Sequence, residues 1–202
     1  MTSAGFAQVT SNSPNNLVWG PPQIWNYDDL PKSTGSKEIA SKLRVSDMNI
    51  VLETTRMTDV QKRFGGIFGE ERGEEWLCLR GGDATDGWVL WLKSGEMDAG
   101  TVGSFPWQRV RRAAKFDERC GLLSKADGKV ELPIPLNLGM PDAKLFQLLG
   151  QPTARHGNTV LYAHEHRGAN QHGPFTALNT LACVIRDGRV TTIDVLKVSF
   201  TD

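Results

Sequence analysis

Alternating apolar and polar positions predict β-strands over most of the chain beyond residue 48. Asp187-Gly188 is a two-residue hairpin signal, because both residue types accept the backbone of a tight turn. Pro106 has no amide donor and would place its strand at a sheet edge. Residues 168–174 are polar and contain glycine, which predicts a loop. The runs with strand character are 49–53, 75–80, 88–93, 102–110, 130–138, 159–166, 178–186 and 189–200.

One short helix is predicted in the stretch that leads from residue 140 to residue 149, where apolar residues recur at helical spacing. Pro141 and Asp142 suit a first helical turn. Gly150 is the natural C-terminal cap, and Pro152 forbids continuation of the helix.

A fainter version of this stretch lies upstream. Thr58 could cap a helix over residues 59–64, which would end at Gly65-Gly66. Each predicted helix is followed by a group of predicted antiparallel strands. The expected fold class is therefore α+β, with two tandem helix-plus-antiparallel-sheet repeats after an irregular N-terminal arm.

The polar, proline-rich beginning of the chain sets the expected organisation. It has no sustained helical or strand period, apart from a short helix expected at residues 37–45 with Ser36 as its cap. The expected parts are the irregular arm (1–46), the first α+β repeat (47–112), a linker (113–128) and the second α+β repeat (129–202).

The second half resembles a known family in its order of motifs. LGM at 138–140, a short helix, LGQPT at 149–153, a strand with a tyrosine, a loop and RDGRV at 186–190 look like the small outer-membrane-assembly lipoproteins of the BamE/SmpA type. The match covers residues 134–198. The doubled arrangement is similar to the β-lactamase-inhibitor proteins, which repeat a helix-and-sheet unit. The first half departs from the pattern: Thr55-Arg56 stands where Leu138-Gly139 does, and its helix is expected to be about two residues shorter.

Composition excludes several classes of function. The 202-residue chain carries 23 basic and 23 acidic residues, so no net field steers it toward nucleic acid or an anionic membrane. No apolar run approaches the roughly 20 residues that a membrane-spanning helix needs. The glycine-rich nucleotide-binding motifs are missing, and no cofactor is expected.

The three cysteines form no CxxC pair. Their odd number fits one disulfide and one buried thiol, or three reduced thiols. Cys78 on a strand and Cys120 in the linker are the expected disulfide, and Cys183 in a strand core is the expected buried thiol. The N-terminus looks like the start of a mature exported chain, although a cytosolic origin predicts the same residues. A periplasmic or secreted location is the hypothesis.

All four histidines lie between residues 156 and 172. His164 and His166 are two apart on a predicted strand and share a face, and His156, His172 or Glu165 could add a further metal ligand, although Glu165 would point to the opposite face. The zinc spacings are absent, so a polar sheet face is the preferred interpretation and no metal site is predicted. No nucleophile motif is present. The loop pair of Glu96 and Asp98 could act as acid and base, but no catalytic residue is predicted.

The remaining signal is aromatic, and it points to protein binding. Tryptophan and tyrosine anchor interfaces because they bring large contact area with few rotatable bonds. Trp88, Trp91, Tyr162 and His164 are the expected contacts on an open sheet face, with His166 at the rim. The predicted function is an envelope protein-binding inhibitor, such as an immunity protein that occludes a toxin or hydrolase. The alternatives are an accessory factor in outer-membrane or envelope assembly, and a hydrolase or metal protein that uses the histidines.

Overall fold

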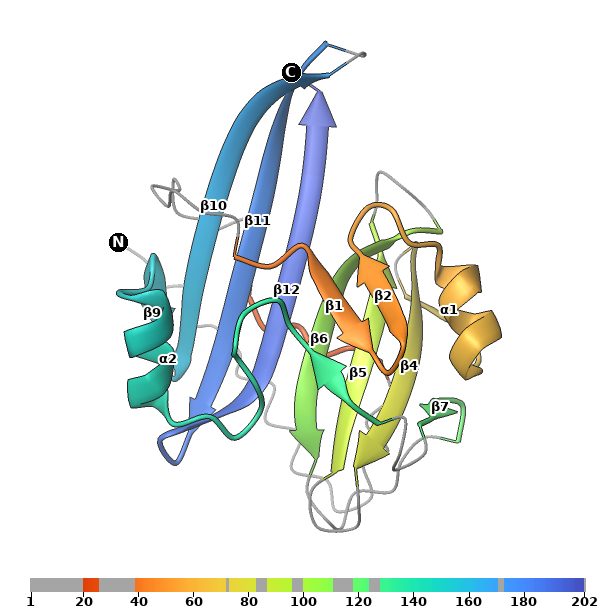
Figure 1. The fold of residues 1–202 in the computed structure, drawn as a ribbon, viewed down its shortest axis with the longest axis horizontal. Helices are drawn as coiled ribbons and strands as arrows, with labels where there is room; N and C mark the ends of the chain where they lie inside the picture. Colours follow the sequence, from red (N-terminus) through yellow and green to blue (C-terminus); the bar gives the residue numbers. More distant parts are fainter. Residues whose placement is uncertain are drawn as a thin grey trace, which may run out of the picture.

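The computed structural model describes residues 20–25, 39–71, 73–82, 87–95, 100–110, 118–123, 128–170 and 173–201. Within these residues the chain forms two helices and two sheets (Figure 1). The large sheet has the strand order β3-β4-β5-β6-β12-β11-β10-β9, and its neighbouring strands are antiparallel. The expected α+β class is confirmed at this level.

The central strands of the large sheet carry runs of consecutive buried residues, because both of their faces are covered. A short strand, β7, pairs with β4 in parallel. The bounds are β3 (Gly69–Glu71), β4 (Glu74–Gly82), β5 (Gly87–Ser94), β6 (Val102–Val110), β7 (Gly121–Leu122), β9 (Ala154–His156), β10 (Thr159–Asn170), β11 (Gly173–Arg186) and β12 (Arg189–Thr201).

The two helices have the same length, eight residues each. They are α1 (Met57–Phe64) and α2 (Asp142–Leu149), so the expectation of a shorter first helix is wrong. Each helix ends at a glycine with positive φ, Gly65 at 73° and Gly150 at 77°. Glycine suits these two positions because a Cβ atom disfavours a left-handed backbone.

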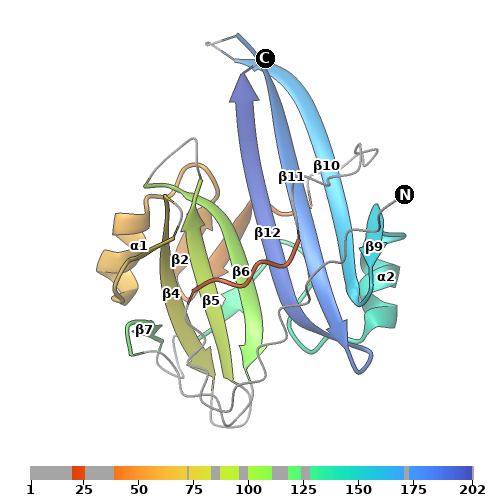
Figure 2. The ribbon, with the colours of Figure 1, turned by 180° about the vertical axis from the view of Figure 1, so that it is seen from behind.

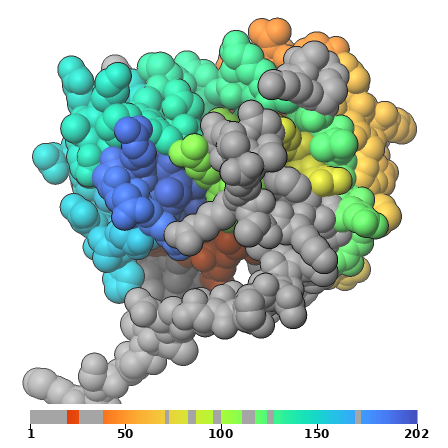
Figure 3. Space-filling model, turned by 90° about the horizontal axis from the view of Figure 1, so that it is seen from below, coloured from red at the N-terminus to blue at the C-terminus, as the bar shows by residue number. Residues whose placement is uncertain are grey.

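The starts of the two helices are held by the same kinds of backbone hydrogen bond. In each half, the amide of the first helical residue donates to the carbonyl of a glycine that lies just before the last strand, β6 or β12. An amide of that last strand donates to the carbonyl of the residue two positions before the helix. The bonds are Met57 N to Gly100 O (2.8 Å) and Asp142 N to Gly188 O (3.0 Å), with Val102 N to Thr55 O and Val190 N to Met140 O at 2.9 Å each. In the second half these bonds hold the β11–β12 turn against the segment that leads into α2, and Figure 3 shows the two in contact.

A second, three-stranded sheet covers part of the helix-bearing face of the large sheet (Figure 1). It consists of β2 (Met48–Val51), β1 (Lys42–Val45) and β8 (Val130–Glu131). The expectation of a short helix and an irregular arm up to residue 46 is therefore wrong for β1. Leu43 and Val45 alternate with exposed residues, and the pairing with β8 makes the strand.

The strand expected over residues 130–138 extends only over β8. Pro133 and Pro135 remove two amide donors just beyond it, so the ladder of hydrogen bonds cannot continue. This stretch leads instead to α2.

The two halves join where β6 pairs with β12. Pro106 is therefore inside the sheet, opposite Asp194, and the expectation of an edge strand is wrong. On the other side of β6, the register with β5 passes from Trp107 to Ser104 without a pair at Pro106. The proline is accommodated because the ladder is interrupted where its missing amide would have donated.

Both faces of the large sheet bear buried side chains. The main core lies between the sheet and the layer of helices and small sheet, and includes Val60 of α1 and Leu145 of α2, both 0% exposed. A smaller cluster lies on the other face of the first half and consists of Trp76, Cys78, Val89, Trp91 and Cys120. Figure 2 shows residues 20–25 crossing this other face of the sheet.

Candidate protein-binding surface

Trp88 and Trp91 point to opposite faces of β5, as their spacing predicts, but both are buried. Trp88 is 8% exposed and lies edge-on to Trp107, with 6.4 Å between ring centroids. Trp91 is 1% exposed and lies edge-on to Trp76 at 5.1 Å. The expectation that these rings lie on an open face is wrong, because both faces of the first half are covered.

Tyr162 is also buried, at 4% exposure, and it holds α2 to the sheet. Its hydroxyl donates to the carbonyl oxygen of Gly150, the residue that ends α2, at 3.2 Å. Burial raises the pKa of Tyr162 from 10.0 to about 12, and the Cys183 thiol beside it acts in the same direction. This ring, too, was expected on the open face and is instead a core residue.

Replacing Tyr162 by phenylalanine is expected to remove a phenol that titrates with a pKa of about 12 in an absorbance titration of the folded protein. The folded-state pKa is raised, so the unfolded chain loses this proton first as pH rises from about 10 to about 12. Stability should therefore fall in that window, and more steeply in the wild type than in Tyr162→Phe. Equal slopes in melting temperature between pH 9 and pH 12 would contradict this account.

His164 and His166 lie on one face of β10, as predicted. His164 is half-buried and His166 is exposed. His156 lies at the end of β9 beside the first residue of β10, and His172 is outside the described residues. Within the described part of the chain, no three histidine, cysteine or carboxylate side chains are grouped as a metal site requires.

One carboxylate of the first half forms an ion pair between neighbouring strands. Glu74 forms an ion pair with Lys93 at 2.6 Å across β4 and β5, which is a structural role. Glu96 and Asp98 lie outside the described residues.

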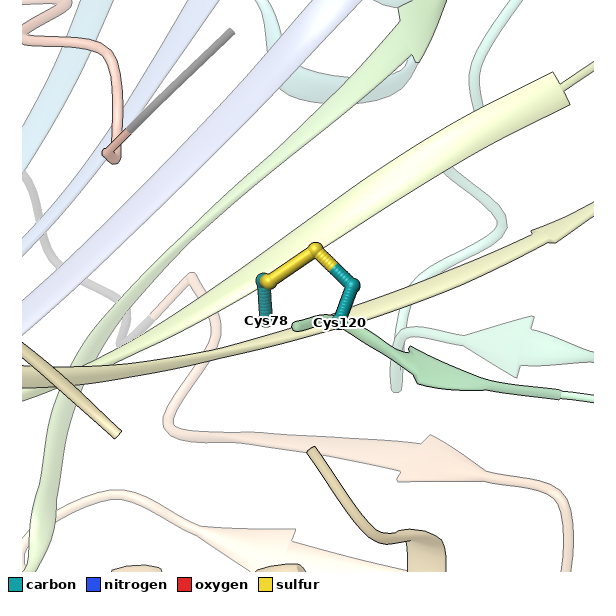
Figure 4. Close-up of a disulfide and its surroundings, with 2 residues drawn as sticks. All are labelled: Cys78 and Cys120. Carbon is teal, nitrogen blue, oxygen red and sulfur yellow. A yellow bond between two sulfur atoms is a disulfide. The ribbon is translucent and has the colours of Figure 1, made fainter. Parts of the chain in front are cut away.

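The predicted disulfide between Cys78 and Cys120 is confirmed (Figure 4). It ties the middle of β4 to the segment that forms β7, and Cys183 is a buried thiol, as expected. Burial raises the pKa of Cys183 to about 12. Gly121, next to the disulfide, packs so closely on the end of α1 that a Cβ atom there would lie 2.6 Å from the Phe64 carbonyl oxygen. A disulfide fits an oxidising compartment.

Exposed His166 and Phe200 and half-buried Phe175 lie on a part of the sheet that extends beyond β6. The pairing of β6 with β12 ends at Ser104 and Leu196, whereas β10, β11 and β12 continue. We call these continuing residues the distal extension: 164–170 of β10, 173–179 of β11 and 197–201 of β12. Figures 1 and 2 show the three strands rising well beyond the ends of β4, β5 and β6. The loop expected at residues 168–174 is thus mostly strand.

One face of the distal extension continues the face of Tyr162 that packs against the helices. On it, Phe175 lies across Gly168, its directly paired neighbour, so that a Cβ atom on Gly168 would come within 2.9 Å of the ring. His166 lies beside both, with its ring centroid 6.0 Å from that of Phe175. The absence of a side chain at Gly168 therefore leaves room for both aromatic rings.

The opposite face of the distal extension presents apolar side chains with a charged pair beside them. Phe200 is 43% exposed, the most exposed phenylalanine of the described residues. Leu178 and Val198 are half-buried and directly paired. Glu165 and Arg167 form an ion pair at 2.8 Å on this face. Apolar groups surrounded by polar ones are typical of protein interfaces.

Comparison of the chain with protein-family models, curated proteins and solved structures finds no match. Neither described helix is long and apolar enough to span a membrane. Functional inference therefore depends on the chemistry of this chain's own surface.

Sequence reasoning named His166 but missed Phe175 and Phe200. The glycine and proline around residues 168–174 resemble loop composition, and the predicted strand begins only at residue 178, so Phe175 lay outside the predicted elements. Phe175 could have been found from its spacing to Gly168, which equals the spacing between Gly81 and Trp88. In both cases an aromatic ring lies across the glycine.

Proposed function

We propose that this chain is an exported protein-binding inhibitor that contacts its partner through the distal extension. The observation that carries the proposal is that the distal extension presents aromatic side chains on both faces, His166 and Phe175 on one and Phe200 on the other. Large rings fixed on rigid strands lose little conformational entropy on binding, which is why such residues dominate interface energies. The Cys78–Cys120 disulfide supports an oxidising location, periplasmic or extracellular.

We further propose that the chain consists of two repeats. A constant sequence offset relates Met57 to Asp142, Gly65 to Gly150 and Glu74 to Thr159, the starts of α1 and α2, the glycines that end them and the starts of β4 and β10. Each helix is followed by four strands of the large sheet in the same order along the chain.

The junction of the two halves supports the same proposal. The offset that relates Val102 to Val190 also relates Pro106 to Asp194, and these last two residues pair with each other. A strand that pairs with its own counterpart in this way lies on a two-fold axis, as in a symmetric dimer. The repeats therefore support a β-lactamase-inhibitor-like arrangement, in which the distal extension is the part that the first repeat lacks.

Alanine substitution of Phe200, Phe175 or His166 is expected to weaken partner binding while leaving folding nearly intact. Ring truncation at an interface centre costs about 2 kcal/mol or more, roughly a 30-fold loss of affinity. The partner would first be captured from an envelope extract with the wild-type chain and then purified. Affinity and thermal midpoint would be measured on the same variants.

The matched control is Leu145→Ala, a core truncation expected to lose about 2–5 kcal/mol of stability. A partner whose toxic or hydrolytic activity is blocked on binding supports an inhibitor. A stoichiometric partner that keeps its activity would favour the assembly-factor alternative. If all three ring variants bind as tightly as the wild type, the distal extension is not the interface.

A further inference from the structure

Among the described residues, the side chain of Glu53 from the first half contacts the edge of β12 in the distal extension. Beyond Leu196, no described strand pairs with β12 on the side of β6. The amide of Ser199 points to that side and donates to Oε1 of Glu53 at 2.6 Å, and the Ser199 hydroxyl donates to Oε2 at 2.8 Å. The carboxylate of Glu53 thus takes the hydrogen bond that the carbonyl of an added strand would accept.

The charge of Glu53 is matched as well. Lys197, two residues before Ser199 and on the same face, lies with its Nζ 3.5 Å from Oε2 of Glu53. Both side chains are about one quarter exposed, at 26% and 23%. Among its described residues, this face of the distal extension carries Lys197, His164 and His166 and no carboxylate of its own. The edge therefore favours an acidic occupant.

Glu53 occupies its position in a backbone conformation that favours glycine. Its φ is 62°, and its amide donates to the carbonyl of Val102 at 2.7 Å. In the second half, Gly139 has a φ of 82° and donates to Val190 at the same distance. A glutamate at such a position is strained relative to glycine. This strained backbone conformation places the Glu53 carboxylate in contact with β12.

We propose that the edge of β12 over residues 197–201 receives an extended, acidic segment of the protein partner, and that Glu53 occupies this edge in the unbound chain. The inference rests on the proposed function and specifies the partner's chemistry. The partner's backbone carbonyl replaces the Glu53 carboxylate on the Ser199 amide, and a partner aspartate or glutamate pairs with Lys197. Main-chain hydrogen bonds of this kind supply affinity, and alternate side chains supply specificity.

The test uses the full chain and a short peptide of alternating valine and glutamate. Two further peptides serve as comparisons: one with lysine in place of glutamate, and one with proline at the centre, which cannot donate there. Glu53→Gly removes the competing carboxylate and relieves the strained φ, and it is expected to bind the acidic peptide about tenfold more tightly than the wild type. Glu53→Gln keeps the backbone and removes only the charge, and it should show a smaller gain.

The matched control is the double variant Glu53→Gly with Ser199→Pro. Its proline removes the outward amide at a position where an edge strand tolerates it, so the gain in peptide affinity should disappear. Melting curves would show that each variant is folded. Equal binding of the acidic and lysine peptides, or unchanged affinity in both Glu53 variants, would overturn the proposal. Concentration-dependent self-association of Glu53→Gly in place of peptide binding would identify a second copy as the occupant and would also overturn it.

Failure of this inference can be distinguished from failure of the proposed function. If a partner captured through Phe200 and Phe175 binds Ser199→Pro as tightly as the wild type, the strand-addition proposal fails and the protein-binding function stands. If the acidic peptide binds as expected but the ring variants leave partner affinity unchanged, the edge proposal stands and the ring surface fails.

Discussion

Replacing Cys78 and Cys120 together by alanine is expected to lower the free energy of unfolding by roughly 3–4 kcal/mol. The two cysteines are 42 residues apart, and the bond between them restricts the unfolded chain over that loop. In the folded state it anchors the β7 segment to β4, where Gly121 packs against the end of α1. For a chain of this size the melting temperature should fall by on the order of 10 °C.

Melting temperatures measured with and without a thiol reductant isolate the contribution of the disulfide to stability. The wild type and Cys183→Ala should both lose stability on reduction, because Cys183 is a buried thiol outside the bond. The double alanine variant should not respond. Three reactive thiols in the unfolded, non-reduced wild type would contradict both the bond and the oxidising location inferred from it.

Trp91→Ala is expected to destabilise the protein by about 3–5 kcal/mol, the usual cost of removing a large buried ring. Trp91 is 1% exposed, and it packs edge-on to Trp76 in the small cluster that also contains the disulfide. The cavity left by the ring would lie beside Cys78, so loss of packing and loss of support for the disulfide segment should occur together. Denaturant unfolding would measure the change.

Phe200→Ala is the matched comparison for Trp91→Ala. It truncates a ring that is 43% exposed, so the expected change in stability is within about 0.5 kcal/mol. Trp91→Ala should reduce partner binding only in proportion to the unfolded fraction, whereas Phe200→Ala should reduce it in fully folded protein. A Trp91 variant as stable as the wild type but unable to bind would restore this ring as a partner contact.

The backbone course of single elements was determined by local chemistry and could be predicted from the sequence. Gly65 and Gly150 end the two helices because each adopts a positive φ that other residues avoid. Asp187 and Gly188 form the expected turn, with φ of 51° and 68°. Alternation placed His164 and His166 on one face, because the side-chain period of a strand is two wherever the strand lies.

Which elements pack against each face of a strand was decided by the tertiary structure. The alternation of side chains along a strand predicts that Trp88 and Trp91 point in opposite directions. Both are buried only because both faces of the first half are covered in the folded protein. Pro106 lies inside the sheet because the strand beside it comes from the other half of the chain.

The candidate surface depends on such distant pairings as well. The distal extension exists because β6 begins only at Val102, so that β10, β11 and β12 continue past its first residues. Glu53, which contacts the edge of the extension, lies far from Ser199 in the sequence. Local pattern determines which residues can form a strand and which share a face. Long-range contacts determine which of those faces and edges remain exposed, because burial is a property of the neighbours and not of the segment.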